Sequence, residues 1–168
     1  MTSSTALADL LELTIAVELP HLRAIPDGPG TARPNRPSGK GWSMREELGH
    51  LLDSAVNNHN RFVRAALEAA YAGPGYAENP WVDVHRYVER PWSTLVGEWH
   101  AHNTILVPLL RNIPDAKLAT PCAVGGGAPV TLAFLVDEYV LHMQHHLDQV
   151  LRREVVTRYP RGGETPRS

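Results

Sequence analysis

The sequence predicts an all-α protein, a four-helix bundle in a single domain. Four long segments carry apolar residues at the spacing of one helix face, loops rich in glycine and proline separate them, and we find no convincing strand pattern. The length of 168 residues is typical of one domain. With 43% hydrophobic and 20% charged residues, the composition is that of a globular protein. We expect residues 1–158 to form the domain and residues 159–168 to be a disordered tail.

The first helix is expected from about Thr5 to Ile25. Its leucines and isoleucine repeat at helical spacing, and Pro20 should kink or end it. The next stretch, from Pro26 to Gly41, is rich in proline and glycine and is longer than most connections between helices. It is either a flexible tether, or a lid or interface element.

The second helix should begin at Ser43, because Ser43 and Glu46 have the spacing of a capping box. It can run to about Ala72, where a Gly-Pro-Gly sequence follows. One face of this helix is apolar and includes His59. The opposite face carries a polar stripe that consists of His50, Asp53, Asn57, Arg61 and Arg64.

The third long helix is predicted from Pro91 to about Asn112, with a bend at Pro108. Proline is favoured at the first position of a helix, whereas inside a helix its ring collides with the preceding turn. The stretch before it, residues 76–90, is interrupted by Pro80 and predicts turns with at most a short helix.

The last helix, predicted from Thr131 to Val156, carries the most distinctive pattern of the chain. His142 and His146 are four residues apart, which places their Cβ atoms about 5–6 Å from one another on one helix face. That spacing suits two imidazoles that bind one metal at about 2.0–2.1 Å each. Alone, however, such a pair is also typical of buried, hydrogen-bonded histidines. A metal site requires a third ligand.

The second helix offers two candidates for that ligand. His59 lies on the apolar face, so a rule that ligands face the core chooses it. His50 lies on the polar stripe, which can line the wet cleft that a catalytic metal requires. The pattern alone leaves this choice open.

Two segments resemble signatures of the DinB-like (YfiT-like) metalloprotein superfamily. WSMREELGHLLDSAVNNHNRF, residues 42–62, resembles its second-helix signature, and PVTLAFLVDEYVLHMQHHLDQ, residues 129–149, resembles its last-helix signature. The resemblance implies a four-helix bundle of DinB-like topology with long inter-helix connections, usually dimeric. It also implies one divalent metal, held by His50, His142 and His146. His59 then becomes a core or boundary residue.

The resemblance also implies an enzyme. Three neutral imidazoles leave a coordination position for water or substrate, as in catalytic zinc sites, and we expect zinc or nickel. The superfamily includes thiol-dependent S-transferases, thiol-dependent isomerases and presumed hydrolases. We therefore expect a metal-dependent enzyme for a small-molecule substrate, first a thiol S-transferase with a low-molecular-weight thiol as cosubstrate, and second a hydrolase. The alternative is a non-catalytic metal-binding dimeric bundle.

Further polar residues lie near the expected ligands in the sequence. Asp53, Asn57 and Arg61 recur about once a turn after His50, and Gln149 lies one turn beyond the last histidine. They could orient a ligand ring or contact substrate. The other interpretation is an ordinary solvated helix face.

Other classes of protein are disfavoured. The net charge is −2 and the basic residues are dispersed, so we expect no nucleic-acid partner. No apolar run approaches the roughly 20 residues of a membrane span, and the N-terminus lacks the basic region of a signal peptide. We expect a soluble, cytoplasmic protein. Phe134, Leu141 and His145 form a second face on the last helix, which predicts a homodimer contact there or at the long loop.

Overall fold

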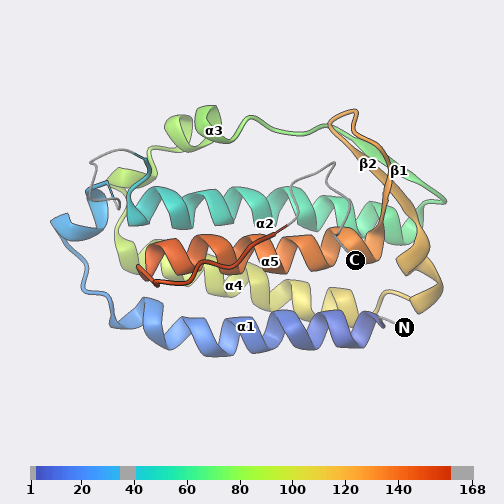
Figure 1. Cartoon of the computed structure of the whole chain (residues 1–168), viewed down its shortest axis with the longest axis horizontal. Coiled ribbons are helices and arrows are strands. Elements are labelled where there is room, and N and C mark those ends of the chain that lie inside the picture. The colour runs from blue at the N-terminus through green and yellow to red at the C-terminus, as the bar shows by residue number, and fades with distance from the viewer. Residues whose placement is uncertain (1–2, 35–40, 160–168) are drawn as a thin grey trace.

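The four amphipathic segments form four long helices, as the sequence predicts (Figure 1). The computed structural model describes residues 3–34 and 41–159. The bundle in this part of the chain consists of α1 (Ser4–Ala24), α2 (Met44–Leu67), α4 (Trp92–Arg111) and α5 (Leu132–Val150). The predicted all-α four-helix bundle is confirmed.

The helices pack in a ring in which α1 and α2 each contact both α4 and α5. In Figure 1, α2 and α4 run in one direction, and α1 and α5 run in the opposite direction. The bundle is therefore not a simple up-down-up-down array. The long connection between α2 and α4 makes this possible, and it contains the short helix α3 (Glu78–His85), which lies outside the bundle on α2.

The two helices that carry the predicted metal ligands both begin at a side-chain cap. At the start of α2, the Ser43 hydroxyl accepts from the Glu46 N–H, and the Glu46 carboxylate accepts from the Ser43 N–H at 2.8 Å. The predicted capping box is confirmed. At the start of α5, the Thr131 hydroxyl accepts from the Phe134 N–H at 3.1 Å. Such caps satisfy N–H groups that have no partner inside the helix.

The expectation of no strands is wrong, because a small sheet lies at one end of the bundle. Its order is β1 (Tyr71–Gly73), β2 (Pro121–Val124) and β3 (Val130–Thr131), with β1 parallel and β3 antiparallel to β2. These strands are too short to show alternation in the sequence. α2 ends at Leu67 instead of about Ala72, and the chain then enters β1.

The last helix also ends earlier than predicted, at Val150 instead of Val156. Arg152 has a left-handed backbone with φ of 53°, which stops the helix. The chain then turns back along α5 (Figure 1). Arg153 fixes this return, because its guanidinium binds Asp148 at 2.8 Å and Glu18 of α1 at 2.7 Å.

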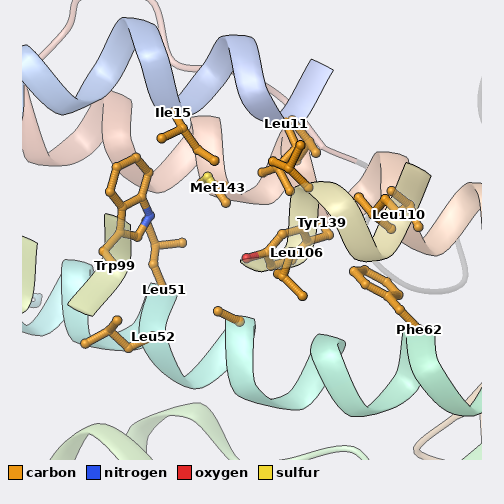
Figure 2. Packing of buried hydrophobic residues seen from close by; sticks show 14 of the residues in the cluster. Leu11, Ile15, Leu51, Leu52, Phe62, Trp99, Leu106, Leu110, Tyr139 and Met143 are labelled. Carbon is orange, nitrogen blue, oxygen red and sulfur yellow. The ribbon is translucent and has the colours of Figure 1, made fainter. Parts of the chain in front are cut away.

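The core lies between the four helices, and every one of them contributes to it (Figure 2). Its largest buried members include Leu11 of α1, Phe62 of α2, Trp99 of α4 and Met143 of α5. The buried Tyr139 hydroxyl donates to Asn103, which satisfies both polar groups inside the core. His142 and His146 flank Met143 in the sequence, and both of their rings lie beside the ring of His50 of α2.

The long connection after α1 is partly tied to the bundle. Residues Pro29–Ala32 form a short 3₁₀ helix, and the Arg45 side chain of α2 binds Thr31 at 2.8 Å and Asp27 at 2.9 Å. A free tether therefore does not describe this part of the connection. Residues 35–40 and the predicted tail after Tyr159 lie outside the described residues. None of the described helices combines the length and the hydropathy that a membrane crossing requires.

Candidate metal centre

His50, His142 and His146 meet between α2 and α5. One ring nitrogen of each histidine lies within 4.8 Å of the other two, and Nε2 of His50 is 3.0 Å from Nε2 of His142. Two nitrogens that bind one ion at 2.0–2.1 Å are separated by about 3 Å when the angle between them is near 90°. The other candidate, His59, lies elsewhere and packs edge-on against the ring of His102.

The direction of the helices brings these residues together. His50 lies in the second turn of α2, and the two histidines of α5 lie in its second half. Because α2 and α5 run in opposite directions, the beginning of one faces the end of the other (Figure 1). A spacing of four residues then directs both rings of α5 toward the same point on α2.

Burial keeps the histidines neutral at physiological pH. Burial lowers the pKa of His50 to about 3, and the nearby His146 adds to this shift. Burial also lowers the pKa of His142 well below its ordinary value, with contributions from the two other site histidines. Burial and His145 lower the pKa of His146 to about 4, while the carboxylate of Glu78 opposes that shift. Neutral imidazole is the form that binds a metal.

Glu47 holds the ring of His146 in one orientation. Its Oε2 atom accepts a hydrogen bond from Nδ1 of His146 at 2.6 Å, and both side chains are buried. The other ring nitrogen, Nε2, is buried and has no hydrogen-bond partner among the described residues. A histidine that donates one N–H to a carboxylate and offers its other nitrogen to an ion is a common metal ligand. The three histidines therefore fit a divalent metal.

Sequence reasoning missed Glu47, although a signal was present. Glu47 precedes His50 by three residues, so the two side chains lie on the same face of α2. The sequence prediction used only the adjacent Glu46, as part of the capping box.

Aromatic rings cover the histidines on two sides. The ring of Trp42, just before α2, lies 4.9 Å from the ring of His50. The ring of Tyr159, from the segment that returns along α5, lies 5.0 Å from the ring of His142. These rings shield the site from bulk water.

A cavity of about 320 Å³ adjoins the histidines on the side of His142. This volume is at the lower end of the range for small-molecule sites. The cavity lies between α2 and α5, and its lining includes Asn58, Arg61, Tyr76, Glu138, His142 and Tyr159.

Two residues of the polar stripe predicted on α2, Arg61 and Asp53, line different cavities. Arg61 lines the cavity beside His142, together with Ser54 and Asn58, which sequence reasoning did not select. Asp53 lines a second cavity on the α3 side of α2, and its carboxylate accepts from the Tyr87 hydroxyl at 2.6 Å. Ser54 and Asn58 follow His50 by one and two turns, which keeps them on its face of the helix.

Two further predicted residues have identified partners. The side-chain amide of Asn57 donates to the main-chain oxygen of Asp53 at 2.8 Å. The side-chain amide of Gln149 forms a hydrogen bond with Nε2 of His145 at 2.6 Å. His145 in turn packs edge-on against the ring of His146, so Gln149 reaches the site through another residue.

Comparison with known proteins agrees with this fold. The family model of the DinB superfamily matches residues 10–150. The structure of YfiT from Bacillus subtilis superposes with a TM-score of 0.78 at 22% sequence identity, over 89% of this chain and 84% of that chain. YfiT is described as "a probable metal-dependent hydrolase with an unusual four-helix bundle topology". At this identity the similarity shows a shared fold. A search of curated proteins found no match.

Proposed function

We propose that this chain, which belongs to the DinB superfamily, is a metal-dependent hydrolase whose metal is bound by His50, His142 and His146. The observation that carries the proposal is the convergence of three neutral imidazoles, two buried and one half-buried, beside a cavity. The description of YfiT as a metal-dependent hydrolase supports the choice of reaction. Zinc and nickel are the ions that we expect, since both accept imidazole ligands.

A divalent metal at this site would lower the pKa of a bound water or thiol and so supply a nucleophile near neutral pH. The residues of the chain have other tasks. Glu47 holds the Nδ1 proton of His146 and thereby fixes which nitrogen faces the metal. Trp42 and Tyr159 limit access of bulk water. The cavity beside His142 accommodates the substrate.

Thiol S-transfer is the second candidate reaction. The only cysteine, Cys122, is buried in β2, so the chain cannot supply the thiol at this site. A thiolate nucleophile would therefore come from a low-molecular-weight thiol in solution, and the cavity is large enough for a small cosubstrate.

The first test is metal content. Untagged protein should hold about one zinc or nickel ion per chain, and a variant with both His142→Ala and His146→Ala should hold none. His59→Ala is the matched control, because it removes a histidine outside the site and should retain the metal. An absence of metal in the parent protein after incubation with zinc and nickel would overturn the proposal.

The second test separates the two reactions. Metal-loaded protein is assayed with p-nitrophenyl acetate in the absence of thiols, and with 2-mercaptoethanol and 1-chloro-2,4-dinitrobenzene. Turnover of the ester by the metal-loaded protein, lost when the metal is removed, supports hydrolysis. Turnover of the thiol and aryl chloride alone assigns S-transfer instead.

A further inference from the structure

Arg61 is a buried cation at the wall of the cavity. Its exposed fraction is 9%, and its guanidinium donates to Oδ1 of Asn58 at 3.2 Å and to the main-chain oxygen of Pro74 at 3.4 Å. Both acceptors are neutral. Within residues 3–34 and 41–159, no ion pair joins Arg61 to a carboxylate.

A buried guanidinium without a paired anion is unfavourable for stability. The group offers five N–H donors in a planar fork, and the two neutral acceptors use only part of them. The fork matches a carboxylate, which can accept two parallel hydrogen bonds from it. A cavity that holds such a group is therefore prepared for an anion.

The position of Arg61 relative to the histidines sets the orientation of that anion. On α2, His50, Ser54, Asn58 and Arg61 follow one another at spacings of four, four and three residues, so they share a helix face. Opposite them on α5, Glu138 precedes His142 by four residues, which is about 6 Å along the helix. The cavity therefore has the three-histidine site at one end and Arg61 with Glu138 toward the other.

The carboxylates of the cavity limit the charge of the ligand. Glu138 is half-buried, and burial raises the pKa of its carboxyl while the charge of Arg61 opposes that shift. The exposed Glu78 also lines the cavity. A dianionic phosphate would meet one guanidinium and two carboxylates. A singly charged anion is repelled less. The remaining walls include Leu135, Tyr76 and Tyr139, which suit an apolar or aromatic body.

We infer that Arg61 binds the carboxylate of a small organic acid whose reacting group points toward His142. The ligand is thus a monoanion with an apolar or aromatic body. The inference rests on the proposed function for the identity of the reacting end, since a metal at the histidines makes that end of the cavity reactive. The binding of the carboxylate by Arg61 does not itself require the metal.

The test is calorimetric titration of the full chain, with and without zinc, using 3-phenylpropionate, its uncharged amide and phenyl phosphate as probes. Wild-type protein should bind 3-phenylpropionate at least about tenfold more tightly than the amide. Arg61→Gln should remove this preference by weakening only the binding of the carboxylate, and Arg61→Lys should reduce it in part. The zinc content of both variants should stay unchanged.

Arg64→Gln is the matched control. Arg64 lies on the same helix and loses the same charge, but it is exposed and pairs with Glu68 at 2.8 Å, so its variant should keep the preference. Circular dichroism establishes that each variant is folded. If Arg61→Gln does not fold, the Lys variant and the wild-type preference for the carboxylate decide the question.

Three results would overturn the inference. These are equal binding of carboxylate and amide by the wild type, no detectable binding of the carboxylate, and tighter binding of phenyl phosphate than of 3-phenylpropionate. Failure of the proposed function looks different, because protein that holds no zinc can still show the Arg61-dependent preference in its metal-free form.

Discussion

The Oε2 atom of Glu47 lies 2.6 Å from Nδ1 of His146, and this hydrogen bond joins α2 to α5 at the three-histidine site. The carboxylate fixes the ring of His146 and increases the basicity of its other nitrogen. It therefore connects the packing of two helices with the affinity of the site for a metal.

Replacement of Glu47 by alanine should weaken zinc binding by about 10–100-fold, the range typical of partners that orient a ligand histidine. Glu47→Gln should have a smaller effect, because the amide oxygen can still accept the hydrogen bond from His146 but carries no charge. Competition with a chromophoric chelator measures both affinities. The control is Glu68→Ala, which removes an exposed carboxylate at the end of α2. An unchanged zinc affinity in Glu47→Ala would mean that Glu47 does not contribute to metal binding.

The metal-free protein should lose stability as the pH falls from about 6.5 toward 3. Burial lowers the pKa of His50 from 6.5 to about 3 in the folded state. The unfolded chain therefore takes up more protons in this window, and acid favours unfolding. The depressed pKa of His50 contributes a few kcal/mol to the free energy of unfolding. This contribution is fully present above about pH 6.5 and is lost progressively as the pH falls toward 3. Urea unfolding of chelator-treated protein at several pH values measures it.

Other groups also titrate between pH 6.5 and 3, so the same series is needed for His50→Gln. The variant lacks the imidazole and should show a flatter dependence of unfolding free energy on pH. Parallel curves for the variant and the parent would mean that His50 is protonated in the folded protein as easily as in the unfolded chain.

Arg153→Ala should destabilise the protein by about 1–3 kcal/mol. The change leaves the buried carboxylates of Glu18 and Asp148 without their cation, and an unpaired buried charge is unfavourable. Arg64→Ala removes an exposed pair with Glu68 and should lower the free energy of unfolding by less than about 0.5 kcal/mol. Equal losses of unfolding free energy in the two variants would mean that the buried ion pairs of Arg153 stabilise the protein no more than an exposed pair does.

Replacement by alanine should change the stability of the protein in opposite directions at two glycines of the bundle. A Cβ atom at Gly49 would lie 2.1 Å from the ring of Tyr87, so Gly49→Ala forces that ring away from Asp53 and should be destabilising by about 1–3 kcal/mol. At Gly97, within α4, a Cβ atom meets open space, and Gly97→Ala should be stabilising by about 0.5–1 kcal/mol. Thermal melts compare both with the parent. A stabilising Gly49→Ala would contradict the packing of Tyr87.

The sequence predicts the helices well because each has a broad apolar face and a clear start. Ser43 and Thr131 identify two of these starts from local chemistry alone. The ends of α2 and α5 are less predictable. One ends where the chain enters a strand too short to leave a pattern, and the other ends where Arg153 pairs with α1. Both depend on contacts distant in the sequence.

The residues of the site also fall into those that local sequence predicts and those that depend on contacts between distant segments. The pair His142 and His146 follows from helical spacing. His50 and His59 are nine residues apart and point to opposite sides of α2, since each residue turns the helix by about 100°. Only the placement of α5 decides between them, and the family resemblance supplied that information. Contacts between elements, such as Glu47 with His146 and Asn58 with Arg61, become visible only in the structure.

The sheet has a mechanical consequence for the cavity. β1 follows α2 directly, and β3 leads directly into α5, so the sheet fastens one end of this helix pair by main-chain hydrogen bonds. The three histidines lie at the other end, and the cavity spans the interval between them. At that end the hydrogen bond between Glu47 and His146 already joins the two helices. A metal at the histidines would add to this connection, so that the helix pair would be fastened on both sides of the cavity.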